Sequence, residues 1–188
     1  MKITYRIKVR ASALALATIL MSWVIVPAAS ADAIQSASTA SFSRVAIVNA
    51  LKDDYLSQAC RSNNLVDLLY ESYADFIGSQ GNQFSDRYWK QFTDDASKLS
   101  NYSKSYSKWL KKNRAKFPRS VRADVSNMSR ELTKEAQILQ SLINAPTMDD
   151  LYFAWDQFDR HLYSTSYSSG QIRKALRLPS RIGLDACP

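Results

Sequence analysis

The single histidine of the chain, His161, has two carboxylates close to it in sequence, Asp156 and Asp159. A histidine beside carboxylates could act as a general base or hold a metal ion. At 100° per residue, however, His161 lies beside the apolar stripe of its predicted helix, whereas both aspartates lie on the other side of that stripe. We therefore expect His161 to be a hydrogen-bonded polar residue at the edge of the core.

A second unusual residue is Asp95, which falls within an aromatic arc between Phe92 and Leu99. An unpaired carboxylate in such a position would be costly. We expect it to pair with a basic side chain or a tyrosine hydroxyl, or to lie where the protein opens to water. The alternative is a ligand-binding acid in a small cleft.

The sequence lacks the motifs of the common enzyme classes. One histidine excludes a di-iron bundle with two Glu-x-x-His motifs, and there is no Cys-x-x-Cys-His haem attachment. No serine stands in Gly-x-Ser-x-Gly, and no glycine-rich phosphate loop is present. We therefore predict no catalytic residue, no metal site and no cofactor.

The positive signal is charge. Nine basic residues and no Asp or Glu fall in the 25 positions from Lys98 to Arg122. The candidate binding residues among them, called the basic block below, are Lys104, Lys108, Lys111, Lys112, Arg114, Lys116, Arg119 and Arg122. Such a concentration indicates either a solvated helix face or a site for an anionic partner.

The N-terminus has the features of a secretory signal peptide. Four basic residues precede an apolar run from Ala11 to Val26, and the small residues Ala29-Ser30-Ala31 follow it. We expect residues 1–31 to be removed and residues 32–188 to form one exported domain with 21 Lys+Arg against 17 Asp+Glu. The alternative is a retained membrane anchor, but the run is shorter than the about 20 residues that a span needs.

Two cysteines remain in the exported part, Cys60 and Cys187. In an oxidising compartment an even pair indicates a disulfide bond. This bond would tether the C-terminal tail to the first helix.

Apolar residues at helical spacing predict four long helices, whose first turns fall at Phe42, Ser85, Ser120 and Thr147. Residues 32–40 are expected to be loose. Whether the polar patch 61–64 interrupts the first helix is left open.

Three stretches are expected to end or separate these helices. Phe117-Pro118 ends the second helix and Asn144-Ala145-Pro146 ends the third, because the residue before proline avoids the α region. Thr147 with Asp150 approximates a capping box for the fourth helix. The polar stretch from Ser164 to Gly170 predicts a turn, after which Ile172 begins one short C-terminal helix.

The expected fold is all-α: an up-down four-helix bundle with a short C-terminal helix and a disulfide-tethered tail. In its core, Trp155 and Phe158 should meet Trp109 and Leu132.

These observations favour a secreted or otherwise extracytoplasmic binding protein that is not an enzyme. Its partner would be an anionic polymer of the cell envelope, lipid headgroups or an acidic protein, with nucleic acid less expected after export. The alternatives are a membrane-active amphipathic protein, with Tyr102, Tyr106 and Trp109 inserting into a membrane interface, and an enzyme that uses carboxylates. The oligomeric state is left open.

Overall fold

The computed structural model describes residues 31–79, 84, 87–179 and 187, with side chains from residue 49 onward. The predicted signal segment, residues 1–31, therefore lies outside the described residues except for Ala31. The chain divides into two units, Met1–Thr39 and Ala40–Pro188, and all packing described below is within the second unit.

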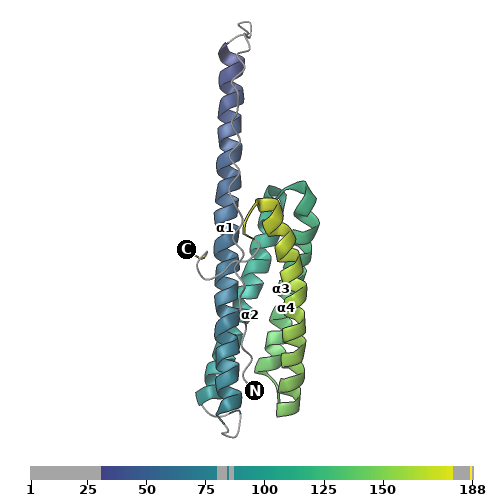
Figure 1. Cartoon of the computed structure of the whole chain (residues 1–188). Helices are drawn as coiled ribbons and strands as arrows, with labels where there is room; N and C mark the ends of the chain where they lie inside the picture. The colour runs from purple at the N-terminus through teal and green to yellow at the C-terminus, as the bar shows by residue number, and fades with distance from the viewer. Residues whose placement is uncertain (1–30, 80–83, 85–86, 180–186, 188) are drawn as a thin grey trace, which may run out of the picture. The chain divides into compact units, whose positions relative to one another are not determined.

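Four α-helices account for nearly all of the described residues, and no strand occurs among them (Figure 1). The elements are α1 (Ala31–Gly78), α2 (Arg87–Asn113), the 3₁₀ helices η1 (Arg114–Lys116) and η2 (Arg119–Val121), α3 (Arg122–Ile143) and α4 (Met148–Leu176). The prediction of an all-α four-helix bundle is confirmed.

Contacts between α1 and α4 show that these helices are antiparallel. The Tyr55 hydroxyl lies 3.0 Å from Ser169 Oγ, and further along α1 the Tyr70 ring lies 5.0 Å from the Trp155 ring. Residue numbers therefore rise on α1 as they fall on α4.

The α2–α3 pair has the same relationship. Ser100 Oγ donates to the Ala136 carbonyl, whereas Ser107 Oγ, two turns later on α2, donates to the Ser129 carbonyl. Gln58 of α1 contacts Tyr102 of α2, whereas Tyr73, further along α1, packs against Phe92, which comes earlier in α2, so α1 and α2 are antiparallel as well. Successive helices thus run in opposite directions, as in an up-down bundle.

The predicted helix boundaries around proline are confirmed. Phe117 has an extended backbone with ψ 151°, so the helical path from α2 through η1 ends before Pro118. At the start of α4, Thr147 Oγ1 accepts a 3.2 Å hydrogen bond from the Asp150 amide and donates to the Asp150 carboxylate at 2.6 Å. Thr147 is thus the N-cap residue of α4.

The predicted turn at Ser164–Gly170 is wrong. Helix α4 continues through it to Leu176, so the residues expected to form a separate short C-terminal helix are the last turns of α4. Polar residues remain helical here because some face inward and find partners: Ser168 and Ser169 are buried, and Ser169 pairs with Tyr55. Helix α1 is likewise continuous through 61–64, and it begins at Ala31, so residues 32–40 are helical and not loose.

The buried apolar residues form two clusters at successive levels of the bundle. The first core cluster contains Leu51, Tyr55, Ala59, Tyr106, Leu110, Phe117, Val121, Val125, Met128, Leu132, Ile172 and Leu176. The second core cluster contains Leu69, Phe76, Phe92, Ala96, Leu99, Ile138, Leu139, Leu142, Ala145, Leu151, Ala154 and Phe158.

This division corrects the expected meeting of Trp155 and Phe158 with Trp109 and Leu132. Phe158 belongs to the second core cluster and Trp155 packs against it, whereas Leu132 belongs to the first core cluster and Trp109 packs against that one. The early part of α4 lies level with the later part of α3, because these helices are antiparallel. On α1, Tyr70 lies at the same level as Phe158, and the two ring centroids are 6.4 Å apart.

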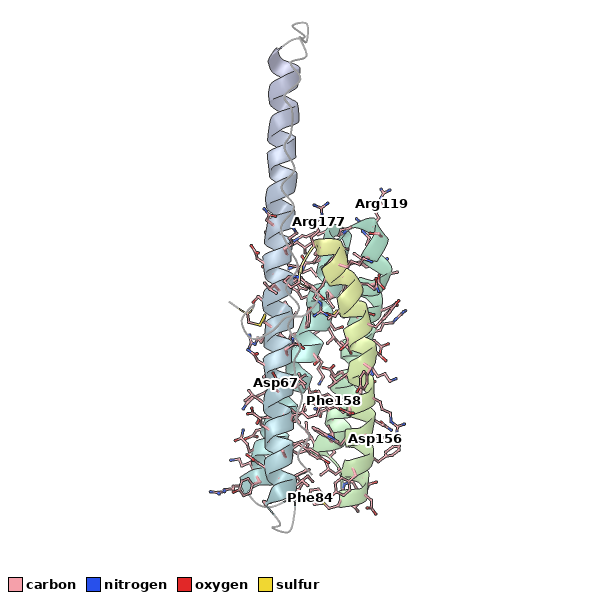
Figure 2. The ribbon with its side chains drawn as sticks, viewed as in Figure 1. Asp67, Phe84, Arg119, Asp156, Phe158 and Arg177 are labelled. Carbon is pink, nitrogen blue, oxygen red and sulfur yellow. A yellow bond between two sulfur atoms is a disulfide. The ribbon has the colours of Figure 1, made fainter. Side chains whose placement is uncertain are left out.

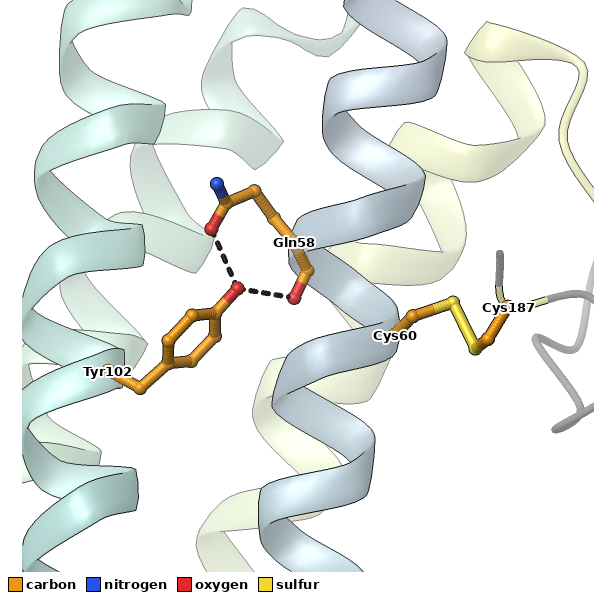
Figure 3. The surroundings of a disulfide bond; sticks show 4 residues. All are labelled: Gln58, Cys60, Tyr102 and Cys187. Carbon is orange, nitrogen blue, oxygen red and sulfur yellow. Dashed lines mark hydrogen bonds between the residues drawn. A yellow bond between two sulfur atoms is a disulfide. The ribbon is translucent and has the colours of Figure 1, made fainter.

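Between the levels of the two clusters, a disulfide bond joins Cys60 of α1 to Cys187, with a Cα–Cα distance of 5.5 Å (Figure 3). The predicted tether of the tail is thus confirmed. Close by, the Tyr102 hydroxyl of α2 lies 2.7 Å from Gln58 Oε1 and 2.8 Å from the Gln58 carbonyl oxygen. This contact fixes α2 against the same part of α1.

Candidate functional site

The basic block lies at the end of the bundle where α2 is connected to α3. It extends from the second half of α2 through η1 and η2 to the first residue of α3. All of its residues are exposed except Arg122, which is half-buried. The lysines of α2 lie opposite the buried Tyr106 and Leu110, as the helical spacing predicts.

Two arginines of the block hold the α2–α3 connection together. Arg122 donates through Nε to the Phe117 carbonyl at 3.0 Å and through its terminal nitrogen to the Ala115 carbonyl at 2.6 Å. Arg114 Nε donates to the Arg122 carbonyl at 3.2 Å. The two Arg122 bonds satisfy carbonyl groups at the end of the path from α2 through η1, where a helix terminus leaves them without partners. Arg114 and Arg122 therefore have a structural role in addition to their charge.

The other six residues of the block are Lys104, Lys108, Lys111, Lys112, Lys116 and Arg119. Within the described part of the chain, none of the block's side chains forms an ion pair with an acidic residue; the basic side chains that do so there are those of Lys98 and Arg160. The positive charge of this end is therefore not neutralised by the described acids of the bundle.

The tertiary structure adds further basic residues to this end. Arg173 and Lys174 lie in the last turn of α4, and Arg177 is its C-cap residue. Figure 2 shows Arg177 and Arg119 at the same end of the bundle. Sequence reasoning missed these residues because they are far from the basic block along the chain. Basic residues in a last helical turn also stabilise the negative end of the helix dipole, by about 0.3–1 kcal/mol each.

A cavity of about 170 Å³ lies between the levels of the two core clusters. All four helices contribute to its wall. Its lining residues are Ala59, Ser62, Asn63, Val66, Tyr106, Met128, Glu135, Leu162, Thr165, Ser166, Ser169 and Arg173. Because Asn63 and Ser166 are exposed, the cavity reaches the protein surface between α1 and α4. The polar patch 61–64 and the polar stretch 164–170, the second of which was predicted to be a turn, thus supply part of this wall.

Polar atoms without partners converge on this cavity. Tyr106 Oη, Thr165 Oγ1 and Arg173 Nε are buried and have no hydrogen-bond partner among the described residues, and all three residues line the cavity. Burial is the main cause that raises the pKa of Tyr106, and the nearby Tyr55 phenol raises it further. The two phenol groups do not meet hydrogen-bond geometry, and Tyr55 is engaged by Ser169.

The cavity wall also contains a buried carboxyl group, that of Glu135, which is 1% exposed. Burial raises its pKa to about 7, and the hydrogen bond from Ser103 opposes this shift. No cation pairs with Glu135 among the described residues. Sequence periodicity places Glu135 on the core side of α3, but its spacing carries no motif that would have marked it.

His161 is a buried, hydrogen-bonded residue, as expected. Its Nε2 lies 2.8 Å from the Glu131 carbonyl and must donate there, because a carbonyl oxygen can only accept. The neighbouring aspartates have other partners: Asp156 pairs with Arg160, and Asp159 accepts a hydrogen bond from Tyr70. The structure does not bring these groups together as a catalytic cluster.

Asp95 forms the structural pair that its aromatic surroundings predicted. It is buried, and it accepts hydrogen bonds of 2.7 Å from both Gln91 Nε2 and Lys98 Nζ. The hydrogen bond and charge of Asp95 raise the pKa of Lys98. Both partners lie on the same helix as Asp95, so the pair stabilises α2 locally and leaves no free carboxylate.

The aromatic residues beside the basic block are packed within the bundle. Tyr106 is fully buried, and Tyr102 and Trp109 are half-buried against the first core cluster. No helix among the described residues has both the length and the apolar character needed to cross a membrane. In the same part of the chain, no group of three or more His, Cys, Asp or Glu residues is arranged to hold a metal ion.

Four-helix bundles serve many unrelated functions, so the fold alone assigns none. Two features of this bundle could bind a partner: the basic end and the polar cavity. Comparison with known protein families, with curated proteins and with solved structures finds no match to this chain.

Proposed function

We propose that this chain is an exported, non-enzymatic binding protein whose basic block contacts an anionic polymer of the cell envelope. The observation that carries the proposal is the set of exposed basic side chains with no ion pair to a described acid. Concentrated like charges raise the local potential and attract an oppositely charged partner.

The arrangement of the charges favours a linear polyanion. Lys104, Lys108 and Lys111 follow one another at helical spacings of four and three residues, so they form a row along one side of α2. Lys116 and Arg119 continue the positive charge into the connection to α3. A chain with repeated anionic groups can contact several of these residues at once.

Insertion into a membrane is less well supported by the packing. A membrane-active helix needs an exposed apolar face next to its basic face. The large apolar residues that are exposed among the described ones are Leu68, Ile77, Tyr152, Phe153, Tyr163 and Tyr167. None of them belongs to the segment from Lys104 to Arg122, where Phe117 is 1% exposed.

Export is part of the proposal and rests on the N-terminal sequence together with the disulfide bond, which is typical of oxidising compartments. N-terminal sequencing of the exported product should give a start near Asp32. A secreted product that still begins at Met1 would contradict the cleavage.

Charge reversal tests the binding surface. The triple variant Lys108→Glu, Lys111→Glu and Lys112→Glu changes three exposed residues of the block. A matched control reverses three exposed basic residues outside it, Lys90, Arg130 and Lys134, and so has the same net charge. Both variants should keep the circular dichroism spectrum of the wild type.

The measurement is retention on immobilised dextran sulfate and polyglutamate, and co-sedimentation with phosphatidylglycerol vesicles, at low and moderate salt. Wild type and control should be retained on the polymers and released as salt rises, since screening shortens to about 8 Å at physiological ionic strength. The block variant should elute at once. Equal retention of the two variants would reject the proposal, and binding to vesicles alone would replace the polymer with lipid headgroups.

A further inference from the structure

The cavity between the two core clusters has a different chemistry from the basic surface. Its wall combines hydroxyl, amide, carboxyl and guanidinium groups with the apolar side chains of Val66, Met128 and Leu162. Protein cores are normally packed without such spaces, and most buried polar groups have partners. Both departures occur here at the same place, so this cavity is a candidate binding site.

We infer that this cavity binds a small organic carboxylate, whose carboxylate group is held by Arg173 and Tyr106. Arg173 Nε can only donate a hydrogen bond, and the Tyr106 hydroxyl can donate one. Neither atom has a partner among the described residues. A carboxylate supplies the acceptors and the negative charge that complement these groups.

Arg173 and Tyr106 lie close enough for such a joint contact. Both residues line the same cavity, so one ligand can face both of them. The Arg173 charge also opposes the rise in the pKa values of Tyr106 and Tyr55. Within the described residues Arg173 forms no ion pair. Its positive charge is therefore available to a ligand.

The other residues of the cavity wall indicate which organic group the ligand carries beside its carboxylate. Val66, Met128 and Leu162 offer apolar contacts, and Thr165 has a hydroxyl without a partner. The volume of about 170 Å³ is similar to that of an engineered cavity of about 150 Å³ that binds benzene. A carboxylate with a ring or short branched chain therefore fits better than a bare inorganic anion.

Glu135 is compatible with an anionic ligand near neutral pH. Burial keeps much of its carboxyl group protonated there, since its pKa is raised to about 7. The carboxyl oxygen that does not face Ser103 can accept a hydrogen bond from a polar substituent of the ligand.

The test uses the full disulfide-bonded chain and benzoate as the probe. Benzamide serves as its neutral counterpart, and acetate as a carboxylate without a body. Titrations followed by backbone amide NMR should show saturable benzoate shifts at Ser62, Thr165 and Ser169, which line the cavity. Shifts centred instead on Lys108 would mean non-specific binding to the basic block and would reject the inference.

Two conservative variants locate the carboxylate contact. Arg173→Gln removes the charge, and Tyr106→Phe removes the hydroxyl but retains the ring. Because both changes are conservative in size, at least one variant should fold as the wild type does. Each should weaken benzoate binding tenfold or more. Arg177→Gln, an exposed arginine outside the cavity, is the matched control and should bind as the wild type does.

The other outcomes overturn the inference. If benzamide bound as tightly as benzoate, the cavity would not require a carboxylate. If acetate bound as tightly as benzoate, the cavity would not require an organic body on the ligand. Absence of saturable shifts at every lining residue would mean that the cavity holds only water.

Discussion

Ser103 Oγ on α2 lies 2.6 Å from Glu135 Oε1 on α3, and the same hydroxyl oxygen lies 2.9 Å from the Leu99 carbonyl. A serine hydroxyl has one proton to donate. If Glu135 is protonated, it donates to Ser103, and Ser103 donates to Leu99. If Glu135 is ionised, Ser103 must donate to it and the Leu99 contact is lost. The neutral carboxyl group therefore satisfies all three atoms.

The raised pKa of Glu135 makes stability depend on pH. Below its ordinary value of 4.5 the group is protonated in both the folded and unfolded states. As pH rises from 4.5 to about 7, the unfolded state ionises while the folded state keeps its proton, so the free energy of unfolding falls. The loss should approach about 3 kcal/mol and then level off above the folded-state pKa.

Urea unfolding at a series of pH values checks this prediction. In Glu135→Gln the free energy of unfolding should no longer fall over this pH range. The control is Glu71→Gln, which changes an exposed residue of α1 and should keep the pH dependence of the wild type. A difference between the wild type and Glu135→Gln that stays constant from pH 4.5 to 7 would contradict the buried neutral carboxyl group.

Two phenylalanines on α4 allow a matched test of the second core cluster. Phe158 is fully buried, whereas Phe153 is 65% exposed. Phe158→Ala should lower the free energy of unfolding by about 3–5 kcal/mol, because it removes apolar contacts and leaves a cavity. Phe153→Ala should change it by less than about 0.5 kcal/mol. Chemical denaturation measures both, and similar losses would show that the packing of α4 is wrong.

The disulfide bond should contribute strongly to stability. Cys60 and Cys187 are 127 residues apart in sequence. Closing so long a loop restricts the unfolded chain, with an upper figure of about 4–5 kcal/mol in the chain-entropy model. The double variant Cys60→Ser, Cys187→Ser should therefore melt at a clearly lower temperature. Peptide mapping under non-reducing conditions should find the linked pair, and two free thiols in the native protein would disprove it.

The N-cap of α4 should be sensitive to substitution. Thr147→Ala removes the hydroxyl that accepts from the Asp150 amide and should cost about 1 kcal/mol. Thr147→Ser keeps the hydroxyl and should restore most of the loss. If serine and alanine have the same effect in urea unfolding, the cap is not responsible for the stability of this turn.

Local signals in the sequence determined the helical class, most helix boundaries and the exposed positions of the basic residues. Pro118 and Pro146 restrict the backbone of their own neighbours, and Thr147 caps its own helix. The exposure of Lys108 opposite Leu110 follows from helical spacing alone. These features depend on residues close together in the chain, so a periodic pattern is sufficient to predict them.

Tertiary contacts determined the secondary structure of the polar stretches. Ser164–Gly170 has turn-like composition, yet it remains helical because buried serines find partners on other helices, such as Tyr55 on α1. The same contacts determine the relative register of the helices, and hence which side chains lie at the same level. Trp155 and Trp109 each lie on a predicted apolar stripe, but they pack against different core clusters.

The polar cavity also required the tertiary structure. Tyr106, Glu135 and Arg173 come from three different helices, and each by itself resembles an ordinary residue of its helix. Their convergence depends on antiparallel packing and on the separation of the apolar residues into two clusters. Helical periodicity predicts the face on which a side chain lies, but it contains no information about which residues of other helices lie opposite it.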